Sequence, residues 1–260
     1  MGQGLVIVKL GGSAITQKKK PLTLNRRAIS NIARVLESSS LSLALVHGAG
    51  SFGHYEAARF GISPDSETKS SEGVSKTRAS MAKLNLSIVE ILMKHNLYSY
   101  PIPPISLYHH GAVKSESKEV LNKIIKMGLI PLTHGDVILG KDGFTVLSGD
   151  VIVTDLAKLF RPDRVVFATN VDGIFKLGKT TDKQLLIDEL DPKSVSDLIF
   201  SQVQGDVTGG MRTKLLEAIR IAKIGIDVYF TNGLDGGKLM KALKGEPHAG
   251  TLIRGVKSGN

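Results

Sequence analysis

Cysteine and tryptophan are both absent from the 260 residues, and aromatic residues make up only 5% of the chain. Without cysteine the protein forms no disulfide, no thiolate metal site and no cysteine nucleophile. The few aromatic rings also leave little surface on which nucleic-acid bases could stack. Any chemistry must therefore come from charged side chains, histidine, hydroxyl groups and the backbone.

Long apolar runs are absent as well, since no stretch approaches the ~20 residues that span a bilayer. The apolar run near the N-terminus covers only residues 5–10 and contains Lys9. It therefore predicts a strand and not a signal sequence. Together with the absence of cysteine, this pattern leads us to expect a cytoplasmic protein with no membrane partner.

The charge is strongly positive, with 34 Lys and Arg residues against 24 Asp and Glu, a formal net charge of +10. Such an excess favours anionic partners, whether nucleic acid, acidic lipid or small phosphates. The densest basic cluster is Lys18, Lys19 and Lys20, and elsewhere the basic residues are mixed with acidic ones, which is typical of a solvated surface. We therefore expect small-molecule phosphates and no nucleic acid. A basic nucleotide- or nucleic-acid-binding protein without catalysis is the alternative from a different class.

Short apolar runs alternate with helical patterns almost from end to end. The expected strands cover residues 5–10, 43–47, 98–105, 129–133, 144–147, 164–169, 226–231 and 251–253. The expected helices cover residues 24–37, 76–95, about 120–127, a segment that begins at 191–192, and 211–224. Several strands are apolar on both faces, as in a sheet buried between two helix layers.

This alternation predicts an α/β fold, with an open, mostly parallel sheet and helices on both faces. We expect one domain over residues 1–260, with two lobes around a cleft. The polar, turn-rich residues 63–75 are interpreted as a surface loop or lid.

Glycine-rich turns follow several of the expected strands, where open parallel sheets bind their ligands. The first turn contains Gly11, Gly12 and Ser13, directly after Lys9. Glycine N–H groups can converge on an anion, and Lys9 would add a positive charge. The alternative is an ordinary turn with a lysine that reaches solvent.

The second turn is the string HGAGSFGH at residues 47–54. Three glycines in six residues lead into a helical pattern, as in an anion-binding loop that ends at a helix N-terminus. His54 would lie near that terminus, where an imidazole can donate a hydrogen bond to a phosphate oxygen. His47 is interpreted as the structural end of the strand.

Two further turns place a carboxylate at a strand end, in Gly135-Asp136 and in Gly149-Asp150. Carboxylates in a phosphate cleft commonly hold Mg²⁺ or orient lysines. Aspartates also simply cap turns, which is the alternative for Asp136.

The last turns are Thr169 to Gly173 and the pair Gly209-Gly210 before a helix. Lys214 falls in the first turn of that helix, from which its ammonium group can reach the cleft. An ordinary surface lysine is the alternative there.

Several catalytic motifs are missing from the sequence. There is no GxxxxGK[ST] string, no GxGxxG after the first strand, and no HRD or DFG pair. Lysines, glycine N–H groups, a histidine and aspartates remain. This inventory suits phosphoryl transfer, in which a protein mainly positions two phosphates and stabilises charge.

The strings KLGGS, HGAGSFGH, GDV, SGD, TNVDG and DVTGGMRTKL together resemble the amino-acid-kinase family over nearly the whole chain. Within that family, HGAGSFGH and DVTGGM are most similar to the isopentenyl phosphate kinases and more distantly to the kinases of fosfomycin. The resemblance implies ATP and Mg²⁺ as cofactors, isopentenyl phosphate as the acceptor and a homodimer. A fosfomycin-type or other small phosphate or phosphonate kinase is the alternative.

The resemblance also implies roles for individual residues. The catalytic residues are Lys9, His54, Asp150 and Lys214. The N-terminal lobe binds the acceptor through Gly48, Ala49, His54, Gly135 and Gly149. The C-terminal lobe and adjoining turns bind ATP through Lys9, Gly11, Gly12, Ser13, Lys18, Gly50, Thr169, Asn170, Asp172, Gly173, Gly209, Gly210 and Lys214. No protein side chain is assigned to a metal.

The sequence departs from the family pattern at three positions, Ala49, Asn170 and Val151. Ala49 still offers its N–H group, whereas Asn170 and Val151 each stand where relatives often have an aspartate. An apolar acceptor also needs an apolar wall, for which the helical stripe of Met81, Leu84 and Ile88 is the candidate. Ordinary core packing is the alternative for that stripe.

Overall fold

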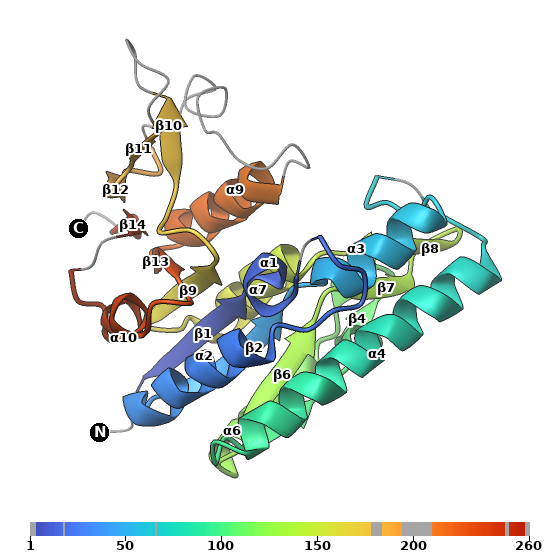
Figure 1. The fold of residues 1–260 in the computed structure, drawn as a ribbon, viewed down its shortest axis with the longest axis horizontal. Helices are drawn as coiled ribbons and strands as arrows, with labels where there is room; N and C mark the ends of the chain where they lie inside the picture. The colour runs from blue at the N-terminus through green and yellow to red at the C-terminus, as the bar shows by residue number, and fades with distance from the viewer. Residues whose placement is uncertain are drawn as a thin grey trace.

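The protein is built on one eight-stranded sheet flanked by helices (Figure 1). The computed structural model describes residues 4–17, 19–65, 67–177, 184–193, 210–247 and 250–257. The strand order in the sheet is β12-β14-β13-β9-β1-β2-β6-β3. All neighbouring strands are parallel except β13 and β14.

The bounds of the elements follow the chain. The sheet strands are β1 Leu5–Leu10, β2 Ser42–His47, β3 Ser99–Pro101, β6 Ile130–His134, β9 Arg164–Thr169, β12 Glu189–Leu190, β13 Asp227–Asn232 and β14 Thr251–Ile253. Three hairpins lie outside it, β4 Tyr108–His109 with β5 Ala112–Val113, β7 Asp136–Leu139 with β8 Phe144–Leu147, and β10 Phe175–Leu177 with β11 Gln184–Leu186. The helices are α1 Gly12–Ile15, α2 Arg26–Ser39, α3 Gly50–Arg59, α4 Ser71–Met93, α5 Pro104–Leu107, α6 Ser117–Lys126, α7 Gly149–Phe160, α9 Gly210–Lys223 and α10 Gly236–Lys244.

Successive residues of the central strands point to opposite faces of the sheet and enter two separate cores. Val6 and Val8 of β1 pack in a cluster with buried residues of α2, α4 and α10. Ile7 lies in the other cluster, with buried residues of α6, α7 and α9. The predicted α/β fold, a mostly parallel sheet with helices on both faces, is therefore confirmed.

The strand order reverses direction at β1, in the middle of the sheet. β1 pairs with β2 on one side and with β9 on the other, both in parallel. The first part of the chain fills the β2 side, and the chain then crosses through α7 to β9. Ligands of open α/β sheets bind at such a reversal of strand order. The predicted glycine turns after β1, β2 and β9 all emerge at this edge.

Two of the predicted elements differ from the observed ones. The strand expected over residues 98–105 is only three residues long, because Pro103 caps and Pro104 begins the short helix α5. The loop expected over residues 63–75 is wrong at its end, where α4 already begins at Ser71. The Ser70 side chain accepts a hydrogen bond from the N–H of Gly73 and so caps this helix.

Two other expectations concern single segments. Residues 144–147 do form a strand, but it pairs with β7 in a hairpin outside the main sheet. The helix expected to begin at Asp191 and Pro192 falls largely on residues outside the described part of the chain.

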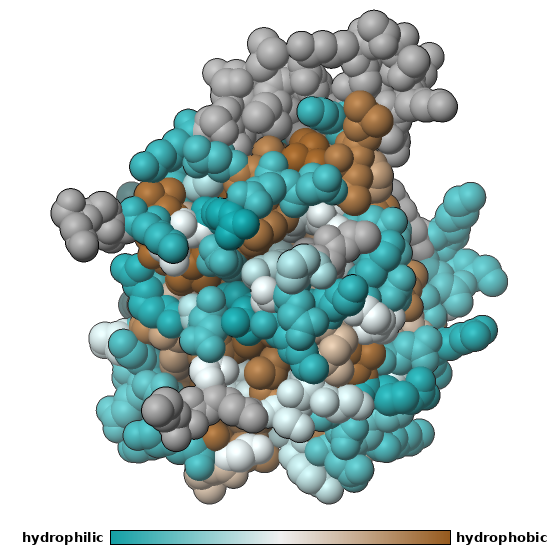
Figure 2. Space-filling model, turned by 90° about the vertical axis from the view of Figure 1, so that its left-hand side faces the viewer, coloured by the Kyte–Doolittle hydropathy of each residue, from teal (hydrophilic) through white to brown (hydrophobic). Residues whose placement is uncertain are grey.

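The described surface is largely polar on the face shown in Figure 2. On the face drawn in Figure 2, polar side chains cover most of the described surface and apolar ones are interspersed among them. Within the described residues, no helix combines the length and the apolar character needed to cross a membrane.

Candidate active site

A buried ion-pair group of Lys9, Asp150 and Lys214 lies at the carboxyl end of β1. Lys9 is near the end of β1 and only 3% exposed, and its Nζ donates to Oδ1 of Asp150, 141 positions later in the chain. Nζ of Lys214 on α9 donates to the other oxygen, Oδ2, at 3.2 Å. The Lys214 side chain remains 22% exposed and can therefore also reach solvent or a ligand. Three of the four predicted catalytic residues thus form one group.

The local sequence explains how Asp150 is placed. Ser148 caps α7, and its Oγ accepts hydrogen bonds from the N–H groups of Asp150 and Val151 at 3.2 and 3.3 Å. Asp150 is therefore held in the first turn of α7, next to the positive end of the helix dipole. A carboxylate is stable there, and it faces both lysines.

The electrostatics of the group keep it charged. Burial alone would raise the pKa of Asp150, but the ammonium charges of Lys9 and Lys214 outweigh it and hold the pKa below its ordinary value. Burial lowers the pKa of Lys9, Asp150 opposes that shift, and the charge of Lys214 adds to it. Lys9 therefore depends on Asp150 to remain an ammonium ion in a buried place.

The first two glycine turns touch each other backbone to backbone. A Cβ atom on Gly12 would lie 2.4 Å from the backbone nitrogen of Gly50, and one on Gly48 would lie 2.8 Å from that of Gly12. Gly50 has a φ of +51°, and a Cβ there would lie 2.2 Å from Oγ1 of Thr16. Space therefore excludes a side chain at all three positions, and at Gly50 the backbone conformation favours glycine as well.

The third and fourth turns also meet. A Cβ atom on Gly135 would lie 2.9 Å from the backbone nitrogen of Gly149. One on Gly149 would lie 3.1 Å from Nζ of Lys9 and 3.1 Å from the carbonyl oxygen of His47. The structure thus brings the glycine turns that follow β1, β2, β6 and β8 together around Lys9.

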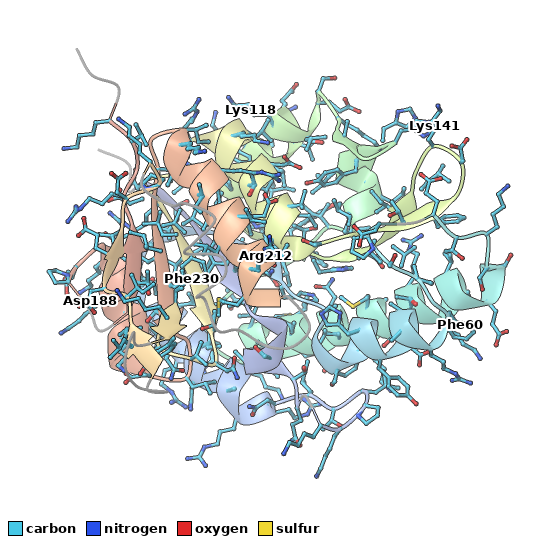
Figure 3. The ribbon with its side chains drawn as sticks, turned by 90° about the horizontal axis from the view of Figure 1, so that it is seen from above. Phe60, Lys118, Lys141, Asp188, Arg212 and Phe230 are labelled. Atoms are coloured by element: carbon cyan, nitrogen blue, oxygen red, sulfur yellow. The ribbon has the colours of Figure 1, made fainter. Side chains whose placement is uncertain are left out.

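Besides the short helix α1, three helices begin at this place, and each begins with a glycine. They are α3 at Gly50, α7 at Gly149 and α9 at Gly210. The first N–H groups of a helix have no acceptor within it, so they carry a partial positive charge. In the view from above, the start of α9, marked by Arg212, lies between Phe230 of β13 and Phe60 at the end of α3 (Figure 3). Such a place favours phosphate groups.

The predicted nucleotide side is tied to the first turn. Oγ of Ser13 donates to Oδ1 of Asn170 at 2.8 Å. Thr169 is buried, and its Oγ1 donates to the carbonyl of Val171 at 2.7 Å, which fixes the turn after β9. Asn170 stands where the family pattern favours an aspartate. Its side chain is nevertheless used, since it accepts the hydrogen bond from Ser13.

Asp172 of the same turn has two partners that the sequence did not predict. Its Oδ1 accepts from Nζ of Lys238 at 2.8 Å and from Nδ2 of Asn232 at 3.2 Å. Both come from the chain around the end of β13, which runs parallel to β9 with Asn232 opposite Thr169. Gly173 packs against Thr251, since a Cβ there would lie 2.5 Å from Oγ1. The sequence did not predict these contacts because they depend on the pairing of β9 with β13, two strands that are far apart in the chain.

His54, the fourth predicted catalytic residue, has an exposed side chain on α3, one turn after Gly50. Ala49 immediately precedes the helix as its N-cap residue. Two residues predicted to bind ATP, Lys18 and Gly209, lie outside the described residues.

A small apolar cluster lies among α3, the start of α4 and the β7–β8 hairpin. Ile62, Val74 and Val137 are buried together, and Phe60 and Phe144 pack against them. The helical stripe offered by the sequence as the apolar wall packs as ordinary core, the alternative given for it. Met81, Leu84 and Ile88 lie in the core between the sheet and its helices, with exposed fractions of at most 1%.

Comparison with known proteins identifies the family. The family model described as the amino acid kinase family matches residues 4–232. The chain belongs to the amino acid kinase family. Because this is a family of kinases, the protein is an enzyme that transfers phosphoryl groups.

Individual relatives of this amino acid kinase cover most of its length. An isopentenyl phosphate kinase of Thermoplasma acidophilum is 32% identical over 96% of this chain and 100% of its own. One from Arabidopsis thaliana is 33% identical over 87% of this chain and 76% of its own. The solved structure of an isopentenyl phosphate kinase substrate complex has a TM-score of 0.82 at 28% identity, over 96% of this chain and 100% of that one. The predicted family resemblance is therefore confirmed.

Proposed function

We propose that this kinase transfers the γ-phosphoryl group of ATP to isopentenyl phosphate, which gives isopentenyl diphosphate and ADP. The observation that carries the proposal is the Lys9–Asp150–Lys214 group, enclosed by glycine turns and three helix N-termini. This arrangement suits two phosphates that must approach despite their like charge. The relatives that share nearly the full length of the chain are named for the same substrate.

The reaction needs positioning more than proton transfer. An oxygen of the acceptor phosphate attacks the γ-phosphorus, a new O–P bond forms, and the bond between that phosphorus and the bridging oxygen of ADP breaks. The attacking oxygen is already ionised at neutral pH, so no strong general base is required. Lys9 and Lys214 offset the negative charge on the transferred group, and Asp150 holds both ammonium groups in place.

The N-terminal lobe is proposed to bind the acceptor. Its phosphate would contact His54 and the backbone of Gly48, Ala49, Gly135 and Gly149. The cluster around Ile62, Val74 and Val137 offers apolar surface to the isopentenyl tail, since it lies among α3, the start of α4 and the β7–β8 hairpin.

The C-terminal lobe and the first turn are proposed to bind ATP. The residues concerned are Lys9, Gly11, Gly12, Ser13, Lys18, Gly50, Thr169, Asn170, Asp172, Gly173, Gly209, Gly210 and Lys214. The link from Ser13 to Asn170 supports this assignment because it joins the turn after β1 to the turn after β9. A nucleotide that spans both turns would place its last phosphate at Lys9.

Magnesium is proposed to enter as part of the MgATP substrate, held by the phosphate oxygens of the nucleotide. Both oxygens of Asp150 are engaged by lysines. Within the described residues, no group of three or more His, Asp or Glu side chains is arranged to hold a metal ion. The side chains described here therefore do not fit a resident magnesium cage.

We also propose a cytoplasmic homodimer. β3 is the outer strand of the sheet, and its far side offers unpaired backbone groups to another strand. Tyr98 and Tyr100 there, and Leu86 and Met93 of the neighbouring helix α4, are exposed apolar side chains. A second copy could cover this edge, and light scattering of the purified protein measures the resulting mass.

The test of the activity is ATP consumption by the purified protein with a panel of acceptors. Isopentenyl phosphate, fosfomycin and UMP are compared at equal concentration, and the product is identified by its mass. We expect the highest kcat/KM with isopentenyl phosphate and a product heavier by one phosphoryl group. Preferred turnover of fosfomycin or UMP would reject the proposed acceptor, and no ATP consumption with any of the three would reject this proposed function altogether.

A further inference from the structure

Two buried histidines occupy matching positions below the acceptor-side turns. His47 is the last residue of β2 and His134 is the last residue of β6, and they are register partners in the parallel sheet. Their rings stack with centroids 4.9 Å apart and an angle of 25° between the planes. Their exposed fractions are 0% and 3%. Neither residue has a part in the reaction proposed above.

Each histidine is followed by a glycine, and each ring contacts that glycine in the same way. Nδ1 of His47 lies 3.1 Å from the carbonyl oxygen of Gly48, and Nδ1 of His134 lies 3.0 Å from that of Gly135. A carbonyl oxygen can only accept, so each ring must carry a proton on Nδ1 to make the bond. The peptide group is planar, so holding the Gly48 carbonyl also fixes the direction of the next N–H group, that of Ala49.

The two turns are also linked to each other and to the catalytic lysine. The N–H group of Gly135 donates to the carbonyl oxygen of His47 at 3.2 Å. The same oxygen lies 3.1 Å from the Cβ position of Gly149, and that position is also 3.1 Å from Nζ of Lys9. A shift in either histidine would therefore be transmitted to the turns around Lys9.

The surroundings keep both rings neutral. Burial, the neighbouring His134 and the charge of Lys9 together lower the pKa of His47 to about 3, against the opposing effect of the hydrogen bonds to Gly48 and Asn85. Burial also lowers the pKa of His134, against its bond to Gly135 and the charge of Asp136, while Arg78 acts in the same direction as burial.

A neutral ring with its proton on Nδ1 has a lone pair on Nε2. Nε2 of His47 lies 3.2 Å from the atom placed as Oδ1 of Asn85 on α4. An amide can present either its oxygen or its NH₂ group at nearly the same place. With NH₂ toward Nε2, both nitrogens of the His47 ring are satisfied.

We infer that His47 and His134 are positioning residues that hold the Gly48 and Gly135 peptides in the orientation that receives the acceptor phosphate. This inference rests on the proposed function for the identity of the acceptor. The N–H group on Nδ1 that donates to each glycine carbonyl is the group that matters for this role. The charge and the size of the ring matter less. Loss of the donor frees the peptide to turn, which weakens acceptor binding and leaves ATP binding intact.

The experiment compares substitutions that keep or remove the donor. Nδ2 of an asparagine stands close to the place of Nδ1 in histidine, so His134→Asn and His47→Asn retain a donor, whereas His134→Leu and His47→Leu retain only apolar bulk. His95→Leu is the control, since His95 also bonds a side chain, Oγ of Ser30 at 2.6 Å, away from the turns. Steady-state kinetics give KM for isopentenyl phosphate and for ATP, and thermal unfolding reports the stability of each variant.

We expect each leucine variant to raise the KM for isopentenyl phosphate by about tenfold, the equivalent of one net hydrogen bond. The KM for ATP should change less than about twofold, and the asparagine variants should stay within about threefold of the wild-type enzyme in acceptor KM. Equal effects of asparagine and leucine, an unchanged acceptor KM in the leucine variants, or a parallel rise in the KM for ATP would overturn the inference.

A spectroscopic measurement on the wild-type protein keeps the inference testable if the leucine variants do not fold or the proposed acceptor is wrong. The ¹⁵N chemical shifts of the imidazole nitrogens report which of them carries the proton. We expect His47 and His134 to be neutral and protonated on Nδ1 at pH 7–8, as their hydrogen bonds to the carbonyl oxygens of Gly48 and Gly135 require. Protonation on Nε2 instead would overturn the inference, whatever the substrate.

Discussion

Nζ of Lys214 lies 3.2 Å from Oδ2 of Asp150, on the carboxylate whose other oxygen accepts from Lys9. One carboxylate therefore orients both cations of the candidate site. Its removal leaves two ammonium groups close together in a buried place, where the charge of each destabilises the other.

The substitution Asp150→Asn is expected to lower kcat by about a hundredfold, because the two lysines lose their common anchor. It should also lower the free energy of unfolding by about 3 kcal/mol, since it leaves buried positive charge uncompensated. Steady-state kinetics and urea unfolding measure the two effects. Glu119→Gln is the control, because Glu119 pairs with Lys123 on the exposed surface of α6. Wild-type kcat in Asp150→Asn would contradict the assigned role.

The pH dependence of kcat should reflect the lowered pKa of Lys9. The ammonium form is required, so activity is present below this pKa and is lost as pH rises through it. The alkaline fall should therefore come at a lower pH than the ordinary lysine value of about 10.4. In Asp150→Asn the opposing charge is gone, and the fall should move to a still lower pH. A profile that is unchanged between the two proteins would argue against an essential charge on Lys9.

His54→Ala is expected to raise the KM for isopentenyl phosphate by about ten- to a hundredfold, because a hydrogen bond to a charged phosphate is lost. The KM for ATP should stay near the wild-type value, since the acceptor and the nucleotide are proposed to bind on opposite sides of Lys9. His109→Ala is the matched control, with an exposed histidine on β4. Unchanged acceptor kinetics in His54→Ala would remove His54 from the site.

Lys238→Met tests the unpredicted partner of Asp172. The KM for ATP should rise by only about three- to tenfold, because the pair is partly exposed and such pairs are weak. The acceptor KM should not change. Lys241→Met on the same helix α10 is the control, since Lys241 is exposed. A larger rise in the acceptor KM than in the KM for ATP would contradict the assignment of Lys238 to the nucleotide side of the site.

Two glycines with similar backbone angles separate strain from steric exclusion. Gly50 has a φ of +51° and Gly61 a φ of +63°, but a Cβ on Gly61 would meet nothing within 4 Å. Gly61→Ala should cost only the conformational penalty of about 1–2 kcal/mol and leave kcat unchanged. Gly50→Ala should cost more and lower kcat strongly, because its Cβ collides with Thr16. Equal unfolding midpoints for the two variants in urea would show that the contact is tolerated.

Local patterns were enough to predict much of the fold. The observed bounds of β1, β9 and β14 are the same as those of the apolar runs that predicted them. The helix α10 was missed, since Gly236 and Gly237 at its start oppose helix formation. Asp235 offsets them by accepting a hydrogen bond from the N–H group of Lys238 at 3.0 Å.

The candidate site was predictable where its signal is local. Glycine turns after strands are visible in the sequence, and the topology of a parallel sheet brings them together. The partners of Asp172 and the stacking of His47 on His134 depend on the register between strands that are far apart in the chain. No pattern within one segment carries that register, so these contacts could only be found in three dimensions.

The direct backbone contacts of Gly12 with Gly50 and of Gly135 with Gly149 restrict how this enzyme can diversify. A larger residue at one of these contacts would require the backbone of the facing turn to move away. The glycine turns can therefore change only together. The Ile62, Val74 and Val137 cluster is formed by side chains and not by backbone contacts between glycines. Selection or engineering toward a bulkier acceptor would accumulate its changes there.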